Sequence, residues 1–275
     1  MCSLSNAIIS QILDTVREAG EIVLSADKVR CDPEKLGIVN KGTASHDFAN
    51  LVTEYDSRVQ AFLVEKLGAL LPEAQFIGEE DGVFADRARE GLCFVIDPID
   101  GTTNFVVGMN RSAVSVGIME NGKPLFGAIL NPYTGDLYHA IRGRGAYMNN
   151  NRIHVSDEPL ERSIAVMGTS PYYKAEIGEK TVEMFKRLLY TCADVRRFAS
   201  ASLDICDVAS GRVAAFCEGR LSPWDFAAGA VILTEAGGYI TDFSGNELQL
   251  DTPSSVLCTT PATKDKMLEL LSDLQ

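Results

Sequence analysis

The chain has 275 residues, of which 46% are hydrophobic and 23% are charged. This ordinary globular mixture excludes a disordered chain, and the length allows one large core or two closely joined units. The formal net charge of −13 disfavours binding to nucleic acid or to an anionic membrane surface. It would also repel an anionic substrate, unless acidic residues hold cations that reverse the local sign.

The cysteines and histidines do not indicate a metal site built from thiolates or imidazoles. Seven cysteines are scattered without a C-x-x-C pair, and only three histidines occur. The N-terminus lacks a signal-peptide pattern, because Arg17 follows the apolar positions instead of preceding them. The apolar run at 227–233 is too short to span a membrane. We therefore expect a soluble cytoplasmic protein without a disulfide framework.

The first half of the chain predicts two helices followed by a mainly antiparallel sheet. Apolar residues recur at helical spacing over 8–23, and a second helix follows Asp56 and ends before Pro72. Asn121-Gly122 predicts a hairpin turn. Strands are predicted at 75–77, 92–96 (ending in Asp97), 112–118, 125–130 and 136–141.

The second half alternates helices with strands. Helices are predicted at 176–190, 202–210 and 224–235, and strands at 192–196, 213–217 and 239–241. Gly237-Gly238 stops the third of these helices. This pattern predicts an α+β protein of two packed parts joined near residue 160, an N-terminal half at 1–160 and a C-terminal half at 161–275.

The strongest chemical signal is the string Asp97-Pro98-Ile99-Asp100-Gly101-Thr102-Thr103-Asn104. Two carboxylates lie three residues apart at the end of a buried strand, and Gly101 permits close backbone approach. The two threonines can cap a following helix, whose free N–H groups would bind phosphate oxygens. Hard carboxylates beside such a helix start suit Mg²⁺. An acidic turn with a helix cap is the alternative interpretation, which the whole string disfavours.

Three other acidic elements are ambiguous when each is taken alone. Gly78-Glu79-Glu80-Asp81 is either a solvated acidic loop or a cation site, because adjacent carboxylates repel one another. Asp56 could be the N-cap of the second helix. Asp225, after Trp224, stands in the first turn of a helix, where the helix dipole favours a carboxylate whether or not it binds a ligand.

Together these elements resemble the inositol monophosphatase family, within the fructose-1,6-bisphosphatase-like superfamily. The shared order is V-T-x-x-D, G-E-E, D-P-I-D-G-T-T-N-F, and W-D-x-A-A-G with E-A-G-G, and it extends from the first helix to Gly238. Gly143-Arg144-Gly145-Ala146, with Asn149, is similar to the family's G-x-G-A-x-x-N segment. The resemblance implies a layered α/β/α/β/α sandwich and a homodimer. The 1–160 half would carry most metal ligands, and the 161–275 half would contribute Asp225 and the substrate-side residues.

The resemblance also implies two or three bound Mg²⁺ ions and a set of catalytic groups. Glu79, Thr102 and Asp56 would be catalytic, with Thr102 and Asp56 paired to orient and activate the attacking water. The N–H groups of Gly101 and Thr102 would bind the phosphate. The expected metal ligands are Glu79, Glu80, Asp97, the carbonyl of Ile99, Asp100 and Asp225.

The resemblance places four residues on the substrate side, namely Glu218, Arg196, Ala199 and Ser200. The family usually has glycine where Ala199 stands, so the added methyl group could narrow the pocket. Arg196 and Arg197 could pair with a second phosphate or form salt bridges. Lys41 could approach the attacking water.

The function implied is Mg²⁺-dependent hydrolysis of a small phosphate monoester by an activated water. The leading substrate is myo-inositol monophosphate, and Li⁺ inhibition is expected. The alternatives are fructose 1,6-bisphosphate, NADP, histidinol phosphate and adenosine 3′,5′-bisphosphate. A non-catalytic binding protein on the same fold is the alternative from another class. No covalent nucleophile or histidine base is needed, because divalent ions can supply the required acidity.

Overall fold

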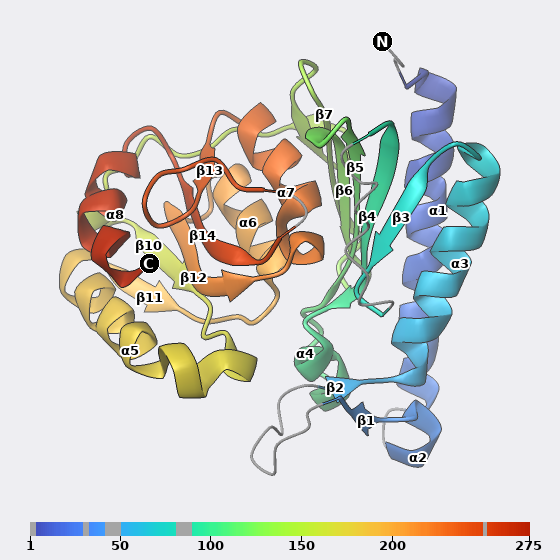
Figure 1. The fold of residues 1–275 in the computed structure, drawn as a ribbon, viewed down its shortest axis with the longest axis horizontal. Coiled ribbons are helices and arrows are strands. Elements are labelled where there is room, and N and C mark those ends of the chain that lie inside the picture. Colours follow the sequence, from blue (N-terminus) through green and yellow to red (C-terminus); the bar gives the residue numbers. More distant parts are fainter. Residues whose placement is uncertain (1–3, 30–32, 42–50, 81–89, 250–251) are drawn as a thin grey trace.

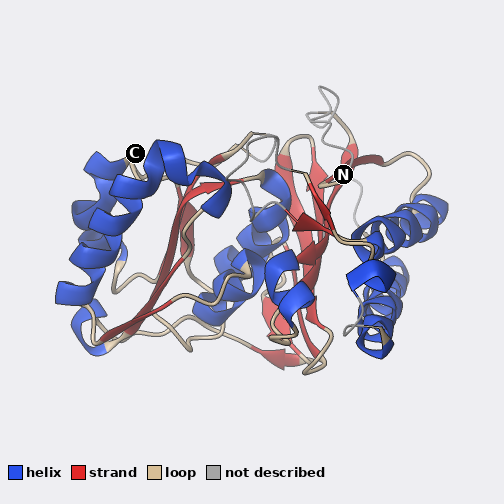
Figure 2. Cartoon of the chain, turned by 90° about the horizontal axis from the view of Figure 1, so that it is seen from below, coloured by secondary structure: helices blue, strands red, loops and turns tan. Residues whose placement is uncertain are grey.

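The computed structural model describes residues 4–29, 33–41, 51–80, 90–249 and 252–275. It is built of five layers (Figure 1). Helices α1 (Asn6–Ser25) and α3 (Glu54–Leu70) cover one face of a seven-stranded sheet, and α6 (Ala201–Ala209) and α7 (Pro223–Glu235) lie between this sheet and a five-stranded one. Helices α5 (Lys174–Thr191) and α8 (Lys264–Leu271) cover the far side, as Figure 2 also shows. The predicted α/β/α/β/α sandwich is confirmed.

Helix α3 begins at a different residue from the one predicted. Its N-cap is Thr53, whose hydroxyl accepts from the N–H of Tyr55. Asp56 is the third residue of the helix, and its carboxylate accepts from the Thr53 N–H at 2.8 Å and from the Thr53 hydroxyl at 2.6 Å. The prediction that Asp56 is the N-cap is therefore wrong, because the cap is three residues earlier and Asp56 completes a capping box.

The seven-stranded sheet follows chain order and is antiparallel except for its first pair. Its second strand, β4, is buried along its whole length and continues past Asp97 to Asp100, with a register shift between these two residues. Asn121 and Gly122 both have positive φ in the two-residue turn between the third and fourth strands, as a type I′ hairpin requires. The strands are β3 (Gln75–Gly78), β4 (Leu92–Asp100), β5 (Ala113–Glu120), β6 (Lys123–Asn131), β7 (Asp136–Ile141), β8 (Ala146–Met148) and β9 (Asn151–Arg152).

The five-stranded sheet has the order β11-β10-β12-β14-β13. Strand β10 is parallel to both of its neighbours, whereas β14 is antiparallel to both of its own. Strands β10 and β14 and helix α8 were not predicted. The strands are β10 (Ile164–Met167), β11 (Asp194–Arg196), β12 (Ala215–Leu221), β13 (Tyr239–Thr241) and β14 (Ser254–Thr259).

Helix α7 is the element that joins the two halves. It is buried almost all round, from Phe226 to Leu233. Two glycines in the first sheet allow its backbone to approach closely, because a Cβ at Gly127 would lie 2.2 Å from the carbonyl oxygen of Ala228, and one at Gly117 would lie 3.1 Å from the Ala228 nitrogen. Residues of both halves share one hydrophobic core around this helix. The division near residue 160 stays a prediction.

The remaining elements are short. They are α2 (Pro33–Leu36), the antiparallel pair β1 (Val39–Asn40) and β2 (Leu51–Val52), and α4 (Thr102–Val107). Helix α4 begins directly after β4, at one end of the seven-stranded sheet (Figure 1). Within the described ranges, no helix combines the length and the apolar character needed to cross a bilayer.

Candidate active site

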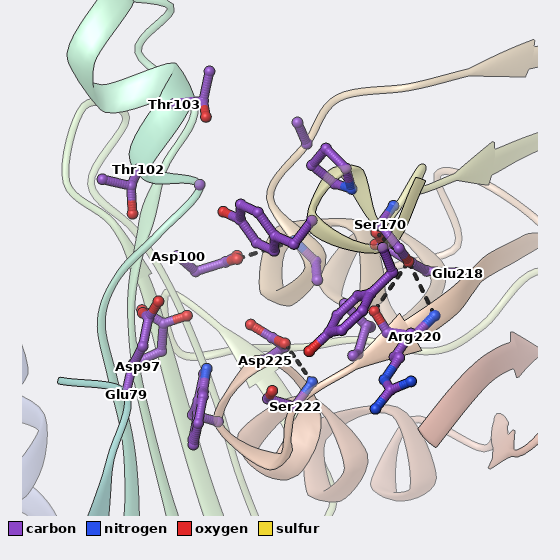
Figure 3. Close-up of a pocket in the computed structure, with 18 of the residues that line it drawn as sticks. Glu79, Asp97, Asp100, Thr102, Thr103, Ser170, Glu218, Arg220, Ser222 and Asp225 are labelled. Carbon is purple, nitrogen blue, oxygen red and sulfur yellow. Dashed lines mark hydrogen bonds between the residues drawn. The ribbon is translucent and has the colours of Figure 1, made fainter. Parts of the chain in front are cut away.

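A cavity of about 470 Å³ opens between the two halves of the chain. One side is formed by the end of β4 and the start of α4, and the other by the end of β12, the start of α7 and the segment after β10. Figure 3 shows carboxylates pointing into this space from both sides. The cavity therefore brings together groups that are far apart in the sequence.

Three aspartates form the floor of the cavity. Asp97, Asp100 and Asp225 each place one carboxylate oxygen within 4.8 Å of the others. The first two come from the irregular end of β4 and the third from the first turn of α7. Figure 3 places Glu79, which follows β3, beside Asp97.

Local structure holds two of these carboxylates in place. Asp225 completes a capping box, in which its carboxylate accepts from the Ser222 N–H at 2.7 Å. Asp100 accepts from the Ser200 hydroxyl at 2.6 Å and from the Ser202 N–H at 2.8 Å, at the start of α6. Ser200 is fully buried and its hydroxyl contacts Asp100. It does not belong to the cavity lining, where a substrate contact was expected for it.

The carboxylates are unfavourable neighbours when no cation lies between them. Burial, followed by repulsion from the other carboxylates, raises the pKa of Asp97 and of Asp225 well above the ordinary range. Burial also raises the pKa of Asp100, although the hydrogen bonds from α6 oppose it. Burial raises the pKa of Glu79 to about 7, with Lys41 opposing the rise and Glu80 adding to it.

This donor set fits divalent magnesium. The described lining of the cavity offers carboxylate, carbonyl and hydroxyl oxygens but no imidazole or thiolate, and Mg²⁺ prefers oxygen ligands. A dication among the carboxylates would relieve their repulsion. The carbonyl of Ile99, in the same lining, accepts from the Thr102 hydroxyl at 3.1 Å and retains a second lone pair.

Glu80 differs from the other predicted ligands. Its carboxylate lies 2.8 Å from the Lys41 ammonium group, and it does not belong to the cavity lining, whereas Lys41 does. Asp81, the third acid of this run, lies outside the described residues.

Thr102 and Asp56 approach each other as the family resemblance implies, but helix α4 is capped differently from the prediction. Its N-cap is Gly101, in the left-handed conformation and without a side-chain cap, so the prediction that the threonines cap the helix is wrong. The Thr102 hydroxyl lies 3.4 Å from the free oxygen of the Asp56 carboxylate. Burial raises the pKa of Asp56 to about 6, against hydrogen bonds from Thr53.

Glu218 reaches the cavity from β12, and its side chain is held between Ser170 and Gly168. Its carboxylate accepts from the Ser170 N–H at 2.7 Å and from the Ser170 hydroxyl at 3.2 Å. The side chain occupies the space above Gly168, where a Cβ would lie 1.8 Å from a Glu218 oxygen. Burial raises the pKa of Glu218 to about 7.

In the segment 196–199, Arg197 and Ala199 line the cavity, and Arg196 does not. Arg196 forms an ion pair of 2.5 Å with Asp194 and is absent from the cavity lining, whereas the adjacent Arg197 belongs to it. Ala199 also lines the cavity, and its φ of 64° is a left-handed value that glycine adopts more readily. The Asn104 amide fixes this segment by donating to the carbonyl of Phe198 at 2.7 Å.

Sequence reasoning did not place several residues that line the cavity. Ser222 could have been found, because Ser-Pro-x-Asp before an apolar run is a helix-start pattern. Residues 170–173 gave no local signal, since the preceding strand β10 was itself not predicted, and Arg220 and Leu221 lie beyond the predicted end of β12 at residue 217. The lining residues that the sequence did not place are Ser170, Pro171, Tyr172, Tyr173, Arg220, Leu221, Ser222 and Ala201.

Two family-like segments meet each other away from the cavity. The Glu235 carboxylate accepts from the N–H groups of Gly143 at 2.6 Å and Gly145 at 2.7 Å. The G-x-G-A segment and the E-A-G-G segment thus form a structural contact between the end of α7 and the loop after β7.

The five layers, with carboxylates converging where they meet, are the arrangement that the sequence motifs implied. The chain belongs to the inositol monophosphatase family, whose model matches residues 6–275. It is 39% identical to Nus factor SuhB of Vibrio cholerae over 77% of each chain, and 32% identical to inositol-1-monophosphatase of Bacillus subtilis over 92% of each. The crystal structure of extragenic suppressor protein suhB from Bartonella henselae superposes with a TM-score of 0.85 at 27% identity, covering 98% of this chain and 99% of that one.

Proposed function

We propose that the protein is a Mg²⁺-dependent phosphatase that hydrolyses a phosphate monoester of a small molecule. The observation that carries the proposal is the meeting of Asp97, Asp100 and Asp225 within 4.8 Å, at a cavity large enough for a small metabolite. Membership of the inositol monophosphatase family supports the same reaction. Myo-inositol monophosphate is the leading substrate. A staphylococcal IMPase-II that is 29% identical to the chain has been solved with inositol monophosphate bound.

The carboxylates of the cavity floor would hold two or three Mg²⁺ ions. Glu79, Asp97 and the Ile99 carbonyl would form one site, and Asp97 would be shared with Asp100 and Asp225 in a second. Glu80, now paired with Lys41, would have to leave this ion pair to bind a third ion. When bound, the ions make a water more acidic and stabilise negative charge on the departing oxygen.

The residues of the chain itself would orient the reacting groups. The Thr102 hydroxyl, which donates to the Ile99 carbonyl at 3.1 Å, would donate its one proton to ionised Asp56 instead, and its oxygen would then accept from the attacking water. The N–H groups of Gly101 and Thr102, at the start of α4, would bind the phosphate. Glu218 would accept from a substrate hydroxyl, and Ala199 would limit the width of the pocket. Ser200 would position Asp100, since its hydroxyl already donates to that carboxylate.

A phosphate-release assay over a substrate panel tests the proposal. The panel contains myo-inositol 1-phosphate, fructose 1,6-bisphosphate, NADP, histidinol phosphate and adenosine 3′,5′-bisphosphate. We expect release with Mg²⁺, no release with a chelator, and inhibition by Li⁺. Asp97→Asn should abolish release, while Asp14→Asn, at an exposed ion pair on α1, should leave it unchanged. Binding of substrates without hydrolysis of any of them would instead support a non-catalytic protein.

The homodimer belongs to the same proposal. Apolar side chains on one helix are left exposed in the single chain, which supports a partner surface there. Sedimentation equilibrium would give the mass of two chains if the proposal holds and of one if it fails. The exposed residues of α5 are Val182, Phe185, Leu189 and Tyr190.

A further inference from the structure

Two arginines line the same cavity as the carboxylates. Arg197 follows β11 and Arg220 lies near the end of β12. Figure 3 shows Arg220 on the side of Glu218, across the cavity from Asp97 and Glu79. In a chain with a net charge of −13, positive side chains at the far wall of an acidic cavity require an explanation.

The guanidinium groups are held by contacts that leave most of their N–H donors available. Arg197 donates to the Thr169 hydroxyl at 3.3 Å, and it forms no ion pair with a carboxylate of the described residues. Arg220 stacks on the Tyr173 ring, 4.3 Å from its centroid, and lies 3.5 Å from the carboxylate of exposed Glu176. Both arginines are exposed to solvent, so a ligand could reach them.

Contacts also connect both arginines to the surroundings of Glu218. The Ser170 hydroxyl accepts from the Arg220 N–H at 3.0 Å, so the backbone of Arg220 is joined to the segment that carries Tyr173. The charge of Arg197 lowers the pKa of Glu218, against the effect of burial. Both arginines therefore lie close to the site that holds Glu218.

We propose that Arg197 and Arg220 form a subsite for a second phosphoryl group of the substrate. The guanidinium fork matches phosphate oxygens in geometry and charge. The phosphate to be cleaved would lie at the carboxylate cluster with its cations, and the second phosphate would lie at the arginines. This inference rests on the proposed phosphatase function. It assigns to the site a preference for bisphosphorylated small molecules over monophosphates of the same scaffold.

Matched substrate pairs test the subsite. The first pair is fructose 1-phosphate with fructose 1,6-bisphosphate, and the second is adenosine 3′-phosphate with adenosine 3′,5′-bisphosphate. We expect KM of the wild type to be about tenfold lower for the bisphosphate of each pair, the effect of one or two charge-assisted hydrogen bonds. Raising the salt concentration should reduce this difference, because the arginines are exposed.

Single substitutions separate the subsite from the reacting centre. Arg197→Gln and Arg220→Gln should each raise KM for the bisphosphate about tenfold relative to KM for the monophosphate, with kcat little changed. The matched control is Arg162→Gln, at an exposed ion pair with Glu158 that is remote from the cavity lining. An equal loss with both members of a substrate pair, or no loss with either, would overturn the subsite.

Calorimetric titration distinguishes failure of the subsite from failure of the phosphatase proposal. Thr102→Ala keeps the metal ligands but should turn over slowly, so both substrates of a pair can be titrated into it with Mg²⁺ present. If the wild type hydrolyses nothing, the same titrations are done on the wild type. Tighter binding of the bisphosphate without hydrolysis keeps the subsite and refutes the phosphatase. Hydrolysis with equal affinity for both members of a pair keeps the phosphatase proposal and refutes the subsite.

Discussion

Glu218→Gln isolates the effect of one buried carboxyl group. The side chain is 8% exposed and accepts two hydrogen bonds from Ser170. Glutamine has nearly the same shape and can still accept these bonds through its amide oxygen, but it cannot ionise. The substitution therefore removes the cost of a buried charge with little change in packing.

The magnitude follows from the pKa of Glu218. Burial raises it from 4.5 to about 7, and each pKa unit corresponds to about 1.4 kcal/mol, so ionisation destabilises the fold by about 3 kcal/mol. Because the folded-state pKa is the higher one, the neutral form is favoured. Its stabilising contribution is complete below pH 4.5 and is lost as the pH rises to about 7. The glutamine variant does not lose this stability, because its side chain stays neutral at every pH.

Urea unfolding followed by far-UV circular dichroism, in a chelator, measures the difference between wild type and variant. The two proteins should have similar unfolding free energies near pH 4, and the variant should be more stable by about 3 kcal/mol near pH 8. The other cavity carboxylates titrate in both proteins, so their effect largely cancels in the difference between the two unfolding free energies. Glu65→Gln, at an exposed position on α3, should show no such trend. A difference for Glu218→Gln that does not change with pH would refute the reasoning.

Four further predictions concern the packing and the candidate metal site. Gly127→Ala should lower the unfolding free energy by about 1–3 kcal/mol in calorimetry, because its Cβ would lie 2.2 Å from the Ala228 carbonyl oxygen. Gly178→Ala, with nothing within 4 Å of its Cβ in helix α5, should instead stabilise by up to about 1 kcal/mol. Asp97→Asn should keep the fold but lose the rise in melting temperature that Mg²⁺ causes in the wild type, and an undiminished rise would contradict the metal assignment. Ser200→Ala should raise the Mg²⁺ concentration for half-maximal activity about tenfold, whereas an unchanged metal titration would exclude a positioning role.

Sequence patterns predicted several strands and helices with correct or nearly correct bounds. The strand at 136–141 and the one at 239–241 have the predicted bounds, and the helix predicted at 224–235 starts one residue earlier. Strand β10 was not predicted, and its four residues, Ile164–Met167, are all apolar and show no alternation. Helix starts were less certain, because several residues near Thr53 and Gly101 are acceptable caps and only the backbone geometry selects one.

The substrate side shows a second limit of local patterns. Arg196 and Arg197 are adjacent and chemically identical, yet the first pairs with Asp194 and the second lines the cavity. Neighbouring side chains in extended backbone point to opposite sides, so the choice depends on the position of the segment in the sheet. Ser200 likewise could not be assigned to Asp100 until α6 was placed against the end of β4.

The sequence by itself determined the chemistry that this protein can offer: carboxylates, hydroxyls and helix starts in the order of one family, with neither imidazole nor thiolate metal ligands expected. Only the tertiary structure decided which of these groups meet. Asp97 and Asp100 are neighbours in the chain, but Asp225 joins them because α7 packs its Ala228 backbone against Gly117 and Gly127. That contact is made between surfaces distant in sequence, so no local pattern contains it, and the strength of the carboxylate cluster as a cation site depends on it.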